Sequence, residues 1–240
     1  MLRQIFTPTY ALPLPGTLKE KTNYLFKSYL LLLAILIGLG IVLKAIDIGL
    51  TDFFHIPSII KSNRVSTDFT QTYGEVLGLL IITLVGPFLE ELIFRLPLDL
   101  KRNSIAFSCA VITYRLVAVH IFRFNVQDLR SYLNILAAVI VFFIIKAALN
   151  QIAPFIERVK SKYYPRFFYL SAIIFGLIHI SNYPLHGALS FIYILFVTPQ
   201  LAMGFFFGNI RMRYGFIWGF FLHAMVNITF ACPLILKALL

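Results

Sequence analysis

Residues 28–46 read SYLLLLAILIGLGIVLKAI, and this stretch decides the class of fold. Lys44 is its one charged residue. A transmembrane helix needs about 20 predominantly apolar residues to cross the hydrocarbon core of a bilayer. A run of this length and composition therefore predicts a helix that spans a membrane.

Further apolar stretches follow the first along the whole chain. The 240 residues are 60% hydrophobic and 13% charged, whereas about a quarter of the residues in soluble domains are charged. After 28–46, the apolar stretches are 75–95, 104–122, 131–150, 167–182, 187–210 and 214–236. Proline disrupts helix interiors, so Pro199 is expected to kink the sixth stretch or to split it in two. We predict an all-α fold, a polytopic membrane helical bundle with about seven to eight transmembrane helices.

The sequence shows no linker or low-complexity segment that would divide this bundle. We therefore expect a single membrane-embedded domain over residues 1–240, which includes a cytoplasmic N-terminal segment at 1–27. Residues 47–73 are expected to form a polar connection. Glycines four residues apart let helix backbones approach closely, which predicts helix contacts at three pairs: Gly74 and Gly78, Gly204 and Gly208, and Gly215 and Gly219.

Basic residues lie mostly between the apolar stretches, where Lys and Arg set membrane orientation. If the N-terminus is inside, the cytoplasmic side holds the larger group: Lys19, Lys21, Lys27, Lys101, Arg102, Arg158, Lys160, Lys162, Arg166, Arg211 and Arg213. We predict an integral protein of a bacterial cytoplasmic membrane with a cytoplasmic N-terminus. The net charge of +11 forms no evident contiguous basic face, so a nucleic-acid partner is not expected.

The first polar cluster within an apolar stretch contains Glu90, Glu91 and Arg95. Residues four apart share a helix face, while adjacent residues point about 100° apart. Glu91 is therefore expected to pair with Arg95, leaving Glu90 to face another neighbour and to act as a general base. The alternative is that all three residues lie at a helix end and extend to the membrane interface.

Two further clusters combine a histidine with a residue four positions away. Phe175 precedes His179 in one stretch, and His223 precedes Asn227 in another. Each cluster alone is also consistent with a structural hydrogen bond between helices. Polar groups at membrane depth are costly and commonly functional, and three such clusters in one chain predict a shared site.

Glutamate and histidine can hold and deprotonate a water molecule, while a second histidine and a carboxamide can donate hydrogen bonds to an oxyanion. This inventory fits hydrolysis of an acyl bond without a covalent intermediate. We favour a site without a metal. Zinc remains a candidate cofactor, and its ligands would be Glu90, His179 and His223.

The sequence lacks the motifs of other classes of hydrolytic enzyme. The chain has no His-Glu-x-x-His zinc motif and no Gly-x-Ser-x-Gly nucleophile motif. The two cysteines, Cys109 and Cys232, have no histidine near them in sequence. We expect both to be unpaired thiols.

The three clusters, in this order, resemble the motifs of the CPBP family. This family contains the CAAX proteases and bacteriocin-processing enzymes, and it includes the prenyl-protein endopeptidases of the Ras-converting type. The resemblance covers about 75–236 and implies a catalytic core with additional helices at about 104–150. It implies Glu90 as general base, His179 as its partner on the water, and His223 and Asn227 as oxyanion donors. Glu91, Arg95 and Phe175 would support the site. It also implies a catalytic cavity that opens towards the cytoplasm.

The resemblance implies an intramembrane endopeptidase that hydrolyses a peptide bond in a membrane-associated peptide or protein, with the lipid bilayer as its environment. Two features depart from the family pattern: the additional helices, and Leu96 where many relatives carry glycine. The alternative function is a non-enzymatic transporter or bacteriocin-immunity-type binding protein that uses the same polar cavity.

Overall fold

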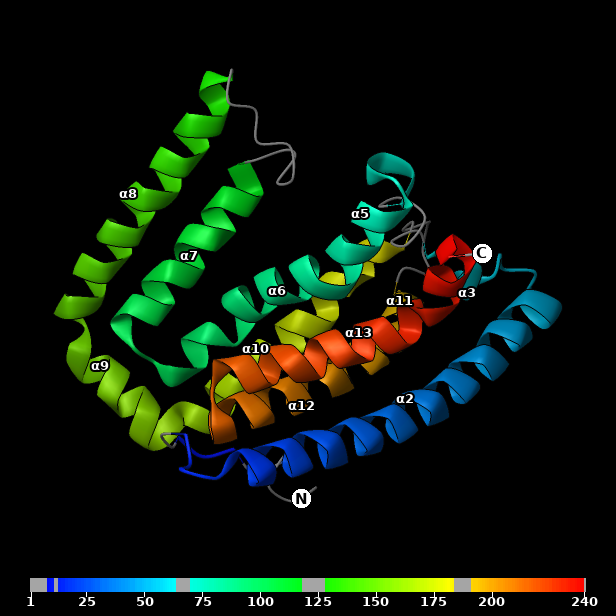
Figure 1. Cartoon of the computed structure of the whole chain (residues 1–240), viewed down its shortest axis with the longest axis horizontal. Helices are drawn as coiled ribbons and strands as arrows, with labels where there is room; N and C mark the ends of the chain where they lie inside the picture. The colour runs from blue at the N-terminus through cyan, green and yellow to red at the C-terminus, as the bar shows by residue number, and fades with distance from the viewer. Residues whose placement is uncertain (1–7, 11–12, 64–69, 118–127, 184–190, 240) are drawn as a thin grey trace.

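The computed structural model describes residues 8–10, 13–63, 70–117, 128–183 and 191–239. Within these ranges the regular structure is helical and contains no strand, which confirms the predicted all-α class. The elements, labelled as in Figure 1, are α2 (Leu18–Phe54), α3 (Ile59–Ser62), α5 (Glu75–Leu80), η1 (Ile81–Val85), α6 (Gly86–Phe94), η2 (Leu96–Asp99), α7 (Arg102–Val117), α8 (Leu129–Gln151), α9 (Ala153–Arg158), η3 (Val159–Tyr163), α10 (Tyr164–Ile178), η4 (His179–Asn182), α11 (Tyr193–Phe196), α12 (Thr198–Tyr214) and α13 (Phe216–Leu239).

Five helical segments of the described chain are long and apolar enough to cross a membrane. They are Leu18–Phe54, Glu75–Asp99, Leu129–Gln151, Ala153–Asn182 and Phe216–Pro233. The protein is therefore an integral membrane protein. Helices α7 and α12 have 16 and 17 residues, so a count of seven to eight spans stays a prediction.

Helix α2 extends beyond the predicted first stretch at both ends. Thr17 and Glu20 form a reciprocal capping box at its start, which satisfies backbone donors that a helix leaves open there. The helix thus begins inside the segment expected to precede it, and it continues to Phe54, inside the expected polar connection. Sequence hydropathy missed these polar turns because capping and tertiary contacts, rather than apolar content, stabilise them.

The buried carboxylate of Asp47 fixes the end of α2 to the next segment. Asp47 is 1% exposed, and its oxygens accept hydrogen bonds from the Ser58 hydroxyl at 2.7 Å and the Ile59 backbone N–H at 2.7 Å. Charged groups need such partners when they are buried. Asp47 therefore holds the short helix α3 against α2.

Pro199 begins a helix rather than kinking one. It lies in the first turn of α12, where proline is tolerated because the first N–H groups of a helix have no intrahelical partner. The predicted sixth stretch, 187–210, therefore contains α12 and the four-residue helix α11 before it, while its residues 187–190 lie outside the described chain. A four-residue helix is too short to cross a bilayer by itself.

The centre of the bundle is formed by α6, α10, α12 and α13, with α2 along one side and the α7–α8 hairpin on the other (Figure 1). A buried cluster that includes Leu32, Phe175, Phe207 and Leu222 joins α2, α10, α12 and α13. Small residues permit the closest approach: a Cβ atom on Gly204 would lie 2.9 Å from the carbonyl oxygen of Ala172. Gly204 confirms the predicted role of small residues in helix contacts.

The first members of two predicted glycine pairs have a different role. Gly74 and Gly215 lie at helix boundaries with positive φ angles of 81° and 101°, which glycine adopts at little cost. A Cβ atom on either would meet nothing within 4 Å. The structure therefore corrects the prediction at these two positions: they turn the chain instead of admitting a neighbouring helix.

Helix α8 is the least buried of the five helical segments that are long and apolar enough to cross a membrane. None of its most apolar 18-residue window is buried within the protein. Helix α7 lies between α8 and α6 (Figure 1) and donates a hydrogen bond from Ser108 to the Leu92 carbonyl of α6. The hairpin at the predicted 104–150 region is thus attached to the site helix through α7; residues 118–122 of the predicted stretch lie outside the described chain.

Candidate active site

Two adjacent carboxylates on α6 lie in opposite environments. The Glu91 side chain is fully buried, whereas the Glu90 side chain is 35% exposed. Adjacent residues point about 100° apart around a helix, so Glu91 faces α13 and Glu90 faces a cavity. We call the surroundings of Glu91 the closed side of the site and those of Glu90 its open side.

On the closed side, Glu91 contacts two cationic or ionisable partners. Its Oε1 atom lies 3.0 Å from His223 Nδ1 and 3.5 Å from Arg95 Nε. The pairing of Glu91 with Arg95 is thus as predicted from their spacing. The Arg95 guanidinium carbon lies 3.8 Å from the centroid of the Phe175 ring, a distance at which a cation is attracted to the ring face.

On the open side, two imidazoles converge on Glu90. Its Oε2 atom lies 3.6 Å from His223 Nε2 and 4.0 Å from His179 Nε2. These distances exceed a direct hydrogen bond but are within reach of one bridging water. The Nδ1 atom of His179 lies 2.7 Å from the carbonyl oxygen of Phe175, which directs the opposite ring nitrogen towards Glu90.

His223 links the two sides, a position that the sequence did not predict. The resemblance grouped it with Asn227 as an oxyanion donor, but its two ring nitrogens face Glu91 and Glu90. The Phe207 ring stacks on the imidazole with centroids 4.3 Å apart. Phe207 therefore fixes the plane of the ring that connects the two carboxylates.

Asn227 lies in the cavity wall and donates a hydrogen bond from Nδ2 to the Ile82 carbonyl at 3.0 Å. Ile82 belongs to the π-helix Ile81–Val85, in which the Gly86 N–H bonds to the Ile81 carbonyl. In this pattern each N–H bonds to the carbonyl five residues earlier, so the Ile82 carbonyl would accept from residue 87. Residue 87 is a proline and has no N–H. Asn227 thus supplies the donor that Pro87 lacks.

Side chains from three other helices hold the C-terminal carbonyls of α6. Ser108 of α7 donates to Leu92 at 2.6 Å, and Ser171 of α10 donates to Phe94 at 2.7 Å. Arg211 of α12 donates to the carbonyls of Arg95 and Leu96 at 2.8 and 3.2 Å. Such bonds satisfy the acceptors that a helix leaves open at its C-terminus, and they fix α6 against the bundle.

A cavity of about 330 Å³ lies on the open side of the site. Glu90, His179, His223 and Asn227, all predicted from sequence, line its wall. Arg115 of α7 also lines it. The structure therefore brings the four predicted catalytic residues to one cavity.

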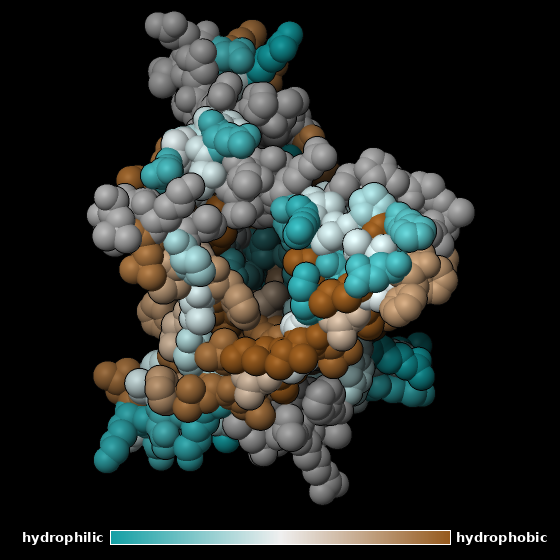
Figure 2. Space-filling view, turned by 90° about the vertical axis from the view of Figure 1, so that its right-hand side faces the viewer, coloured by the Kyte–Doolittle hydropathy of each residue, from teal (hydrophilic) through white to brown (hydrophobic). Residues whose placement is uncertain are grey.

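This cavity opens away from the end of the molecule where basic residues gather. Three amide side chains in its wall, Asn63, Asn182 and Gln200, come from ends of elements on one side of the bundle. Arg166 and Arg213 lie at the opposite ends of α10 and α12. Figure 2 views the molecule from the amide side and shows a hollow with hydrophilic residues in its depth. We call the two sides the cavity end and the basic end.

The residue types at the open side are those that zinc prefers. Two imidazole nitrogens and a carboxylate are common zinc ligands, which bind the ion at about 2.0–2.2 Å. Within the described ranges, no group of three His, Cys, Asp or Glu side chains is placed to hold a metal ion. The set Glu90, His179 and His223 therefore carries no metal-dependent step below.

Sequence reasoning missed three supporting groups. Arg211 is 4% exposed and forms an ion pair with Asp99 at 3.2 Å, yet in the sequence it looked like a loop residue that sets orientation. Phe207 is one of 25 phenylalanines, so nothing marked it. The Ile82 carbonyl is a backbone group, which no residue type reveals. The one indication in the sequence was Pro87, because a proline five residues later cannot donate a hydrogen bond to this carbonyl.

Fold and site together define an integral membrane protein with two carboxylates and two imidazoles inside its helical bundle. A comparison with protein families matches residues 72–229 to the family described as Type II CAAX prenyl endopeptidase Rce1-like. The match covers more than half of the chain, and the protein belongs to this family. It is thus a CAAX-protease-type membrane endopeptidase, for which the substrate is a membrane-associated protein.

Comparisons with curated proteins and with solved structures gave no match.

Proposed function

We propose that the protein cleaves a peptide bond by direct attack of a water molecule that Glu90 deprotonates. The convergence of both imidazoles on Glu90 Oε2 is the observation that carries this proposal. Glu90 takes one proton from the water, and His179 orients the water through Nε2. The hydroxide oxygen bonds to the carbonyl carbon of the substrate, and the carbonyl oxygen becomes negative.

Breakdown of this intermediate returns the proton. The carbon–nitrogen bond breaks, Glu90 gives its proton to the leaving amine, and the products are a carboxylic acid and an amine. The acid proton then passes to the amine, which leaves a carboxylate and an ammonium group. His223 Nε2 and the second N–H of the Asn227 amide are the proposed donors to the oxyanion. Since His223 Nδ1 faces Glu91, donation from both ring nitrogens requires the imidazolium form.

The remaining predicted residues are proposed to position this machinery. Arg95 offsets part of the charge of Glu91, and the Phe175 backbone carbonyl fixes the tautomer of His179. We propose a membrane-anchored peptide or protein as substrate, and the family description makes a prenylated CAAX peptide the first probe to use. A transporter or immunity-type binding function receives no support from the family match.

The Glu90→Gln variant tests the proposal. It keeps the size of the side chain but removes the base, so cleavage of a farnesylated CAAX peptide by the purified protein should fall by about 10²–10⁴-fold. Melting in detergent should stay close to wild type, because Glu90 is partly exposed. Unchanged cleavage would remove Glu90 from the role of base. If wild type leaves this peptide intact, the variant can be used to capture membrane substrates for identification.

We also propose that the reaction is independent of a metal ion. Activity should persist after prolonged chelation, with elemental analysis of the same sample to establish the metal content. Loss of activity on chelation, with recovery on adding zinc, would assign Glu90, His179 and His223 as ligands instead.

We propose further that the basic end faces the cytoplasm, as the distribution of Lys and Arg indicates. The segment just before α2 is then cytoplasmic, because Leu14 is hydrogen-bonded to Arg213 at that end. The cavity would then open away from the cytoplasm, contrary to the expectation from the family resemblance.

Two serines at opposite ends of α10 can decide the orientation. Ser161 in η3 and Ser181 in η4 are both exposed. In a variant without Cys109 and Cys232, a membrane-impermeant maleimide should label Ser181→Cys in intact cells. It should label Ser161→Cys only after lysis. The reverse pattern would place the cavity end in the cytoplasm.

A further inference from the structure

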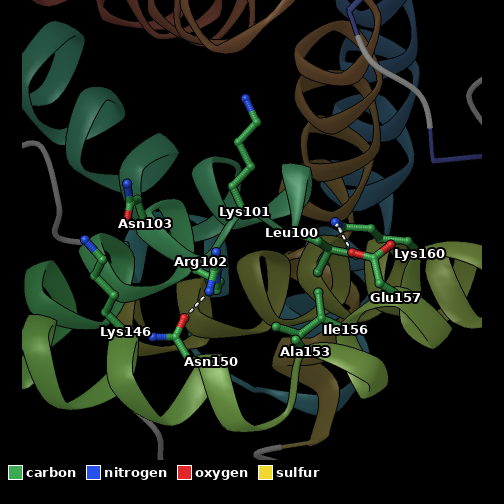
Figure 3. Close-up of a pocket in the computed structure, with 10 residues that line it drawn as sticks. All are labelled: Leu100, Lys101, Arg102, Asn103, Lys146, Asn150, Ala153, Ile156, Glu157 and Lys160. Carbon is green, nitrogen blue, oxygen red and sulfur yellow. Dashed lines mark hydrogen bonds and ion pairs between the residues drawn. The ribbon is translucent and has the colours of Figure 1, made fainter.

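A second cavity, at the basic end, has a different chemistry from the catalytic cavity. It has a volume of about 760 Å³ and lies between the start of α7, the end of α8 and the α9–η3 segment. Ligand sites commonly occupy 300–1,000 Å³, so the cavity has room for a polar headgroup. We call it the basic pocket (Figure 3).

Cationic side chains dominate the lining of the basic pocket. Lys101, Arg102, Lys146 and Lys160 line it, against a single carboxylate from Glu157. Glu157 is paired with Lys160 at 2.7 Å. Within the described ranges, Lys101, Arg102 and Lys146 form no ion pair, so three positive charges lack a carboxylate partner.

Donors in the pocket come from different elements. Those of Arg102, Asn103, Lys146 and Asn150 lie near one another, whereas the Lys101 side chain extends away from them (Figure 3). Lys146 and Asn150 extend from α8 towards Asn103 and Arg102 at the start of α7 (Figure 3). Arg102 donates a hydrogen bond to the Asn150 side chain. An arginine, lysines and amides around one cavity suit a phosphate oxyanion, because charge-assisted hydrogen bonds to phosphate are among the strongest in proteins.

The location favours a lipid over a soluble phosphate. The pocket lies at the end of α8, a membrane-crossing helix that ends at Gln151. Beside it, Phe143 and Ile144 of α8 are 62% and 59% exposed, so an apolar surface continues from the pocket into the bilayer. A phospholipid whose phosphate occupies the pocket would thus place its acyl chains along α8.

We propose that the basic pocket binds the phosphate of an anionic phospholipid, with Arg102 and Lys146 as its principal ligands and Lys101 as a further positive charge in the lining. Basic pockets between transmembrane helices are suited to such headgroups. The site is separate from the catalytic cavity, because no residue lines both. The bound lipid would hold the α7–α8 hairpin to the α9–η3 segment.

The test uses two variants that remove the same charge from the same end of the molecule. The pocket variant is Lys101→Gln, Arg102→Gln and Lys146→Gln. The control variant is Arg158→Gln, Lys162→Gln and Arg166→Gln, whose three residues are exposed and do not line the pocket. Binding of phosphatidylglycerol and phosphatidylcholine to the purified full chain is measured by native mass spectrometry in detergent.

Wild type and the control variant should bind phosphatidylglycerol alike, whereas the pocket variant should bind it at least tenfold more weakly. Phosphatidylcholine should bind all three proteins weakly. Equal weakening in both variants would show non-specific attraction and would overturn the proposal, as would undiminished binding by the pocket variant.

Inorganic phosphate is a second probe that distinguishes the source of the anion. If phosphate alone raises the melting temperature of wild type as much as the lipid does, and does so only with an intact pocket, the site takes a soluble anion and the lipid assignment is wrong. If the triple variant does not fold, Lys146→Met replaces it. This change keeps a long apolar side chain on α8 and should still weaken phosphatidylglycerol binding; unchanged binding would overturn the proposal.

Discussion

Glu90 and Glu91 are neighbours in the chain, yet their carboxylates have opposite environments on the open and closed sides of the site. Glu91 is fully buried and has His223 and Arg95 beside it. Glu90 is partly exposed, and both imidazoles lie at distances that leave room for a water. One carboxylate is fixed by the protein, and the other is available to a reactant.

The difference shows how one turn of helix can supply both structure and chemistry. A buried ion pair is costly to desolvate, so it is useful mainly where it holds neighbouring groups in a defined geometry. Here the closed side orients His223, whose other nitrogen faces the open side. Changes on the closed side should therefore reduce stability first, whereas a change at Glu90 on the open side should reduce mainly turnover.

The largest effect on stability is expected for Arg95→Met. The methionine keeps much of the packing against Phe175 but removes the charge that compensates Glu91. Leaving a buried charge without its partner costs about 3–5 kcal/mol. Thermal unfolding in detergent should reveal the loss, and Glu90→Gln is the matched change on the open side. If both variants melt like wild type, the two sides do not differ as described.

A smaller loss of stability is expected for Gly219→Ala. The added Cβ would lie 3.1 Å from Arg211 Cβ and 3.2 Å from Glu91 Oε2, so the closed side must shift. Overpacking of this kind costs about 1–3 kcal/mol. Gly38→Ala is the control, because its Cβ would meet nothing within 4 Å. Equal melting temperatures for the two variants would show that the closed side tolerates movement.

The smallest effect on stability is expected for Asn227→Ala, which removes one hydrogen bond to the Ile82 carbonyl and should cost about 1 kcal/mol. Adding Pro87→Ala supplies an N–H that can bond to the same carbonyl. The double variant should therefore recover the melting temperature. Its cleavage rate should stay low if Asn227 also stabilises the oxyanion; recovery of both quantities would limit Asn227 to a structural role.

The sequence was most informative where interactions are local. The spacing of Glu91 and Arg95 on one helix predicted their ion pair, and the apolar stretches predicted the helical membrane class. Polar residues within those stretches predicted side chains that line the cavity on the open side of the site. These features depend on helix periodicity and on the cost of polar groups in lipid, both of which are properties of short segments.

Contacts between distant segments could not be predicted in the same way. His223 and Glu91 are 132 positions apart, and Arg211 and the Arg95 carbonyl are 116 apart. Spacing within one helix says nothing about which neighbour meets which face. Asp47 is another example, because its polar side chain indicated a connection between helices, whereas it lies buried in α2. Its hydrogen-bond partners, Ser58 and Ile59, reach it only after the chain turns back.

The π-helix at Ile81–Val85 has a consequence for the lengths that this segment can have. Each residue added to or removed from a helix turns everything beyond it by about 100°. A π-helical turn contains one extra residue, so deleting one residue between 81 and 85 should restore a regular helix. The deletion would rotate α5, which precedes the site, and would leave α6 in place. The same deletion between Glu91 and Arg95 would separate the ion pair. Length variants should therefore survive upstream of Gly86 and fail downstream of Glu90.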